Sequence, residues 1–103
     1  MVDVALSDAI SGAVDQHTIS SSALALSDTD LTDAHIAAAG RAIISVRSGA
    51  INIWYDGSAP TTSAGITFLA GERLVIIGHL DISRLQMIRN GATDAVVDIL
   101  LEG

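Results

Sequence analysis

Glycines at short intervals divide the middle of the chain into segments, and this spacing constrains the fold more than any other feature. The glycines stand at positions 40, 49, 57, 65, 71, 78 and 91. Between them lie runs rich in Ile, Val and Leu, such as residues 41–47 and 73–77. Short β-branched runs bounded by turn residues are typical of an antiparallel sandwich or a small barrel.

Two turn dipeptides predict how some of these strands are joined. Ser48-Gly49 separates residues 41–47 from residues 50–55, and Asn90-Gly91 follows the strand that ends at residue 89. Dipeptides of this kind supply the positive φ angles of tight hairpin turns. We therefore expect one hairpin over residues 41–55 and a second around Asn90-Gly91, with residues 94–102 as the last strand.

Aromatic side chains are scarce, so the core has to be aliphatic. The chain of 103 residues is one domain's worth of sequence and contains three aromatic residues, Trp54, Tyr55 and Phe68. Successive strand residues face opposite sides, so we expect Trp54 or Tyr55 to pack inward, but not both. Ala, Val, Ile and Leu must build the remainder of the core.

The first 19 residues differ from the rest and predict an acidic amino-terminal arm. Leu6, Ile10 and Val14 are four residues apart, which indicates a weak amphipathic helix or an arm that becomes ordered on contact. We expect this apolar stripe to fill a groove on a neighbouring molecule. The carboxylates expected to meet Arg or Lys of that neighbour are Asp3, Asp8 and Asp15.

The predicted fold class is therefore mainly β: a compact antiparallel β-sandwich or jelly-roll-like module with an N-terminal arm. The arm covers residues 1–19 and the module covers residues 20–103. A short strand over residues 23–26 and a helical turn over residues 31–39, capped from within residues 27–30, complete the module. On this division, deleting residues 1–16 is expected to leave the module folded.

Charge and composition exclude several classes of function. Twelve acidic residues against five Arg and no Lys give a net charge of −7, which opposes binding to nucleic acid or to an anionic membrane. The chain has no Cys, and its apolar runs are too short to span a bilayer. We expect a protein made in the cytoplasm, part of whose apolar surface is covered by a partner.

Catalytic and metal-binding patterns are weak. Asp28, Asp30 and Asp33 lack the glycine and the terminal glutamate of a calcium loop, and capping explains them more simply. His17, His35 and His79 do not have metal-ligand spacing. His79 near Asp81, and Asp56 with Glu72, are better explained as turn residues than as catalytic pairs, and no Gly-x-Ser-x-Gly motif is present. We expect no enzyme, no metal and no cofactor.

Three blocks in order carry a family resemblance over about residues 40–102. They are Asn-Ile-Trp-Tyr-Asp-Gly-Ser-Ala-Pro-Thr-Thr-Ser-Ala-Gly-Ile at 52–66, Leu-Ala-Gly-Glu-Arg-Leu at 69–74 and Met-Ile-Arg-Asn-Gly-Ala-Thr-Asp-Ala at 87–95. They resemble the Asp-Gly-x-x-Pro-Thr, Ala-Gly and Ile-Arg-x-Gly-Ala-Thr-Asp-Ala blocks of small virion structural proteins of tailed bacteriophages. In this sequence the conspicuous residues of the blocks are expected to form structural turns: Asp56, Gly57, Pro60, Asn90 and Gly91.

The resemblance implies a non-enzymatic virion protein, in the first place a capsid decoration (cement) protein on the outer surface of the head. Its expected partners are the major capsid protein and further copies of the chain, with a trimer suited to threefold capsomer junctions. A head–tail or tail component is an alternative within the same class. From another class, a surface module that binds carbohydrate would use Trp54 or Tyr55 for stacking.

Overall fold

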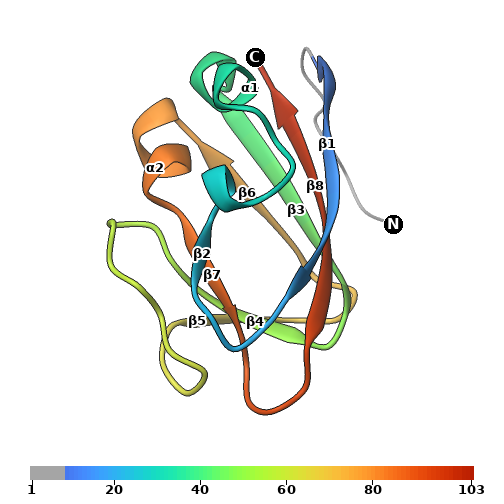
Figure 1. The fold of residues 1–103 in the computed structure, drawn as a ribbon, viewed down its shortest axis with the longest axis vertical. Coiled ribbons are helices and arrows are strands. Elements are labelled where there is room, and N and C mark those ends of the chain that lie inside the picture. Colours follow the sequence, from blue (N-terminus) through green and yellow to red (C-terminus); the bar gives the residue numbers. More distant parts are fainter. Residues whose placement is uncertain (1–8) are drawn as a thin grey trace.

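Two four-stranded antiparallel sheets form the molecule in a computed structural model that describes residues 9–103 (Figure 1). Sheet A has the strand order β1 (Ala9–Ile19), β8 (Ala95–Glu102), β3 (Arg41–Ser48) and β6 (Arg73–Ile77). Sheet B has the strand order β2 (Leu24–Ala25), β7 (Gln86–Arg89), β4 (Ala50–Trp54) and β5 (Ile66–Leu69). The helical elements are the 3₁₀ turn η1 (Leu26–Asp28), α1 (Asp33–Ala38) and α2 (His79–Arg84). The expected mainly β sandwich is confirmed.

The strand order is that of a jelly roll. The first strand pairs with the last, the second with the last but one, the third with β6, and β4 with β5. A long antiparallel ribbon with its turn between β4 and β5 has this pairing, and rolling the ribbon up adds the β8–β3 and β7–β4 contacts. Among the described strands, only β4 and β5 are both consecutive and paired.

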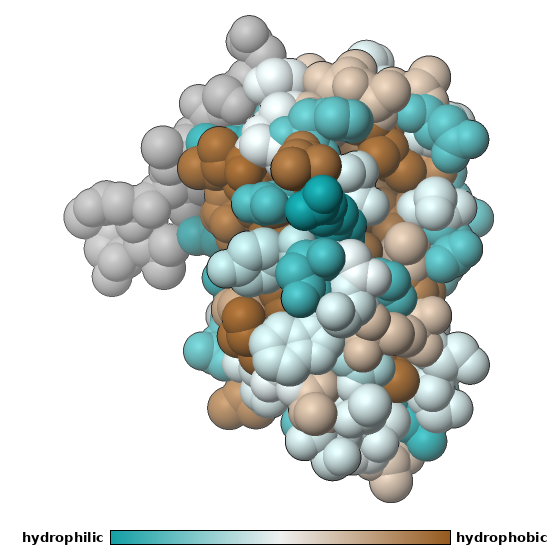
Figure 2. All heavy atoms as spheres, turned by 90° about the vertical axis from the view of Figure 1, so that its left-hand side faces the viewer, coloured by the Kyte–Doolittle hydropathy of each residue, from teal (hydrophilic) through white to brown (hydrophobic). Residues whose placement is uncertain are grey.

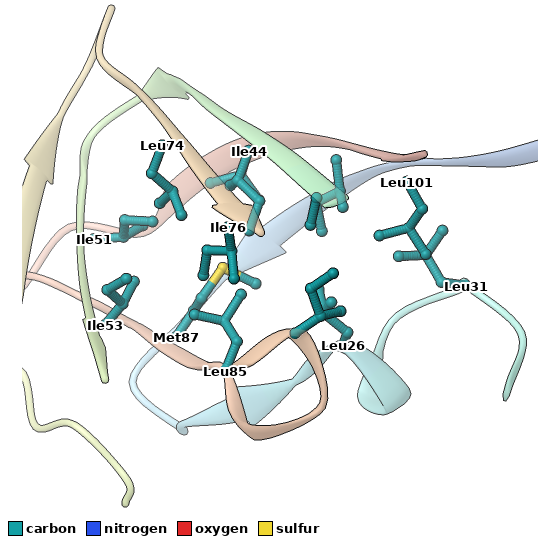
Figure 3. Close-up of a cluster of buried hydrophobic side chains, with 14 of the residues drawn as sticks. Leu26, Leu31, Ile44, Ile51, Ile53, Leu74, Ile76, Leu85, Met87 and Leu101 are labelled. Carbon is teal, nitrogen blue, oxygen red and sulfur yellow. The ribbon is translucent and has the colours of Figure 1, made fainter. Parts of the chain in front are cut away.

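Aliphatic side chains from both sheets fill the space between them. Figure 3 shows Ile44 and Leu101 of sheet A on one side of this core and Ile51, Ile53 and Met87 of sheet B on the other. All five are buried. In β8 the burial alternates along most of the strand, so that every second residue points into the core. Trp54 is half-buried and Tyr55 is exposed.

Neither of the two expected hairpins forms, because consecutive strands lie in different sheets. β3 belongs to sheet A and β4 to sheet B, and the same holds for β8 and β7. Gly49 and Gly91 do have positive φ angles, of 72° and 76°. They turn the chain from one sheet to the other at the lower end of Figure 1 rather than back along the same sheet.

The expected amino-terminal helix is wrong for the described part of the segment. Ala9–Ile19 form the strand β1, which pairs with β8 from Val14↔Leu100 to Ile19↔Ala95. A bulge between Ala9 and Val14, where Gly12 has φ 77°, breaks the regular alternation of the strand. Residues 9–19 are thus part of the sandwich, and the boundary between arm and module does not fall at residue 19.

The short strand β2 and the helix α1 lie at their predicted positions, but the residue that caps α1 differs from the prediction. β2 and α1 fall within the predicted segments 23–26 and 31–39. The cap of α1 is Thr32, whose hydroxyl oxygen accepts a hydrogen bond from the His35 N–H at 3.1 Å. The predicted caps at 27–30 come too early, because η1 takes up Leu26–Asp28.

Candidate functional site

The outer face of sheet A carries one row of apolar side chains that crosses all four strands. Strand register places Val14 of β1 beside Leu100 of β8, Leu100 beside Ile43 of β3, and Ile43 beside Val75 of β6. Residues paired in this way point to the same side of a sheet. We call Val14, Leu100, Ile43 and Val75 the apolar row.

Both ends of the apolar row are open to solvent. Val14 is 61% exposed and Val75 is 41% exposed, whereas Leu100 is half-buried and Ile43 is buried beneath its neighbours. Exposed aliphatic side chains aligned across a whole sheet differ from the scattered single ones that are normal on a surface. Among residues 9–103, the apolar row is thus an ordered apolar surface that no described segment covers.

A polar row runs beside the apolar row, and the two share a shallow depression. The polar row consists of Gln16, Asp98, Ser45 and Arg73, again in register across the four strands. The depression has a volume of about 590 Å³, and members of both rows line it. Its chemistry is therefore that of an amphipathic surface, apolar along one side and hydrogen-bonding along the other.

Arginine side chains concentrate on this face. Arg47 Nη2 lies 2.8 Å from Asp98 Oδ2, and Arg41 Nε lies 3.2 Å from Glu102 Oε1. Arg73, in the polar row, forms no ion pair within the described part of the chain. Three of the five basic residues thus lie on one face of a chain whose net charge is −7.

The outer face of sheet B is covered instead, by the loop of residues 55–65. Beneath this loop lies Asn52 of β4, which is only 1% exposed. Asn52 Nδ2 donates to the Thr61 carbonyl oxygen at 2.9 Å, and Asn52 Oδ1 accepts from Thr67 Oγ1 at 2.6 Å and from Asn90 Nδ2 at 2.9 Å. One amide therefore connects β4 to β5, to the loop and to the β7–β8 turn.

Asn52 is a structural residue that sequence reasoning missed. Its position in an alternating strand predicts an ordinary polar side chain on a half-buried face. The loop that buries it returns over the sheet, and the Gly91 N–H donates to the Thr62 carbonyl oxygen at 2.9 Å. A polar residue in the middle of an aliphatic strand was the available signal, and it was not sufficient to predict three partners.

Four of the five predicted turn residues, Asp56, Gly57, Asn90 and Gly91, lie in turns or bends. Asp56 Oδ1 accepts a hydrogen bond from the Ser58 N–H at 2.9 Å, and Gly57 has φ 94°. Hydrogen bonding from Ser58 holds the pKa of the Asp56 carboxyl below its ordinary value of 3.8, with the charge of Arg84 acting in the same direction. Pro60, the fifth predicted turn residue, is buried in the 55–65 loop at a position that is not a turn.

Beside this turn lies a smaller depression with aromatic walls. Its volume is about 250 Å³, and Trp54, Tyr55, Asp56 and Ile66 line it. Figure 2 views the side of the molecule that carries α2 and the 55–65 loop, where apolar residues form separate patches between polar ones.

The residues predicted to dock on a neighbour do not act as one helical stripe. Ile10 packs against the core, while Val14 faces solvent as part of the apolar row. The Asp15 side chain is only 7% exposed; its Oδ2 lies 3.1 Å from His17 Nδ1 and accepts from the Asp30 N–H at 3.2 Å. Little of that carboxylate remains for an outside cation. Asp3, Leu6 and Asp8 lie outside the described residues.

Histidine and acidic side chains do not gather at one place. Among residues 9–103 there is no group of three or more that could hold a metal ion. Asp28, one of the acids of the rejected calcium pattern, accepts the Ala25 N–H at 2.8 Å through Oδ2. In the same part of the chain, no helix is long and apolar enough to cross a membrane.

Comparisons with protein-family models, with curated proteins and with solved structures found no match to this chain.

Proposed function

We propose that this chain is a non-enzymatic structural protein of a tailed-phage virion, a capsid decoration protein that binds the outside of the assembled head. The observation that carries the proposal is the apolar row across the outer face of sheet A. Jelly rolls are a common architecture of viral capsid proteins. The partner is the major capsid protein, and the chain is made in the host cytoplasm before it reaches the virion.

The energetics suit a protein present in many copies. Covering the exposed parts of Val14 and Val75 contributes about 1–2 kcal/mol each, and the ion pairs beside them add direction rather than affinity. Each single contact is then modest. Because the same contact is repeated at many capsomer junctions, the summed binding free energy stabilises the shell strongly.

Binding to expanded heads that lack the protein tests this proposal. We expect the added chain to occupy these heads and to raise the temperature at which they break open. Val14→Asp places a charge in the apolar row and should reduce occupancy at least about tenfold, since it removes an apolar contact and buries a carboxylate. Leu80→Asp, at a 57% exposed position on α2 away from the row, is the matched control. Equal occupancy by both variants would contradict the use of sheet A.

A carbohydrate-binding surface module is the second candidate, favoured by the depression at Trp54, Tyr55 and Asp56. An aromatic face beside a carboxylate can stack on a sugar ring and accept its hydroxyl hydrogens. Glycan arrays test it. Binding that is lost on Trp54→Ala would favour this candidate, whereas blank arrays together with head binding would favour decoration.

A further inference from the structure

Within residues 9–103, the strand β6 pairs on one side only, with β3, and its other edge is free. At its two ends the Gly78 N–H donates to the Gly40 carbonyl oxygen at 2.8 Å, and the Val46 N–H donates to the Glu72 carbonyl oxygen at 2.9 Å. Hydrogen-bonded and non-hydrogen-bonded positions alternate along an antiparallel pair, so the even-numbered residues of β6 bond to β3. The N–H and C=O groups of the odd-numbered residues, Arg73, Val75 and Ile77, therefore point away from the sheet.

This edge lacks the features that protect β1 and β2, and it is longer than the remaining edge strand, β5, which has four residues. β1 carries a bulge at Gly12, and β2 has only two residues. β6 has five residues, with no proline, lysine or bulge, and Ile77 on its outer face is 71% exposed. Bare edges of this kind pair with another strand.

We propose that β6 pairs with β6 of a second copy of this chain, antiparallel and about a twofold axis at Val75. Val75 then lies opposite Val75 of the second copy, and Arg73 opposite its Ile77. All three outward-facing residues take part, which gives about six hydrogen bonds at two for each pair. A twofold axis makes every contact occur twice.

Charge selects this orientation. β6 begins with Arg73, which forms no ion pair with any of residues 9–103. Asp81 lies just beyond the other end of β6, where Asp81 and Ile77 line the same depression of about 260 Å³. Antiparallel pairing brings Arg73 of each copy beside Ile77 and Asp81 of the other. Parallel pairing of the same two edges would put the outer faces of the two copies on opposite sides of the joined sheet, and Arg73 of one copy would lie far from Asp81 of the other.

The pairing also continues the surface described above. Val75 is the β6 member of the apolar row. With Val75 against Val75, the rows of two copies join end to end into one row across an eight-stranded sheet. The inference does not depend on what that row binds, because the contact is an edge and leaves the face open.

Disulfide trapping tests the pairing directly, because the chain has no Cys. Paired positions in antiparallel strands have Cα atoms about 5.5 Å apart, within the range that disulfides span. We expect Val75→Cys to form a covalent dimer under mild oxidation. Val14→Cys, at the other end of the same row, is the control and should stay monomeric on denaturing gels. Crosslinking of Val14→Cys instead, or of neither variant, would overturn the proposal.

Exchanging the charges of Arg73 and Asp81 gives a second test, in which sedimentation of the free protein at concentrations up to about 1 mM measures the dimer dissociation constant. Arg73→Asp alone and Asp81→Arg alone should each raise the dimer dissociation constant about tenfold, since each change acts twice. The double variant should restore it. A sole trimer, or a monomer at every concentration, would contradict twofold pairing. Failure of head binding by a protein that still dimerises would contradict only the proposed function.

Discussion

Gly49 moves the chain from one sheet to the other within a single residue. Its φ of 72° is one that L side chains rarely adopt. A Cβ atom built there would lie 2.9 Å from Ala95 Cα and 2.9 Å from the Asp94 carbonyl oxygen, both of them backbone atoms. The position needs glycine for its conformation and for its lack of volume.

We predict that Gly49→Ala lowers the free energy of unfolding by about 3 kcal/mol or more, from strain and from overpacking together. Gly57→Ala is the matched control: φ is 94° there as well, but nothing lies within 4 Å of the added Cβ. It should cost about 1 kcal/mol, from conformation alone. Urea denaturation measures both, and equal losses would mean that the β3–β4 crossing has room for a side chain.

Asn52 holds the 55–65 loop against sheet B through three hydrogen bonds at a buried site. We predict that Asn52→Ala lowers the free energy of unfolding by about 2–4 kcal/mol, because it leaves buried donors and acceptors without partners. Gln16→Ala, which removes an exposed amide from sheet A, should change it by less than about 0.5 kcal/mol. Denaturation curves of similar midpoint for the two variants would show that the loop does not depend on Asn52.

Among the elements, β1 differs most from its prediction: the sequence predicts part of a removable arm, and the structure has a strand of sheet A. It covers one side of β8 along Val14–Ile19 and contributes Ala13 and Ile19 to the core. Without it, β8 would become an edge strand with an unpaired backbone.

Deleting residues 1–16 is therefore predicted to destabilise the sandwich by about 3 kcal/mol or more, contrary to the expectation of a removable arm. A deletion of residues 1–8 leaves β1 complete and should keep a cooperative unfolding transition. Thermal unfolding followed by circular dichroism compares the two. A truncation at residue 16 that unfolds at the original temperature would show that β1 is dispensable.

Strands were easier to predict than their partners. β3 and β6 lie where glycine spacing and β-branched runs predict strands, because those signals are local. The pairing of β3 with β6 and β8 depends on residues far away in the sequence, and Ser48-Gly49 has the same local chemistry in a hairpin as in a crossing between sheets. The helical spacing of Ile10 and Val14 misled for a related reason: pairing with β8 overrode a weak local preference.

At the scale of the whole molecule, the apolar row on sheet A could not be predicted from the sequence, although one of its four residues is a predicted contact. The sequence predicts Val14 as an apolar contact of a helical arm, whereas in the structure Val14 lies at the end of the apolar row. The other three members come from strands separated by tens of residues and meet only through register. The arginines of this face gather for the same reason, which places three of the five basic residues of an acidic molecule on one side.

The pairing of the first strand with the last has a consequence for the order of events during synthesis. β8 is the neighbour of both β1 and β3, so sheet A has no centre until residues 95–102 have left the ribosome. Until then β1 and β3 remain without their shared partner, with Ile43, Ile44 and Val46 open to other chains. Long-range closure of this kind folds slowly. While β8 is missing, the six Asp of residues 1–40, which contain no Lys or Arg, give the growing chain a negative charge that opposes its contact with other chains.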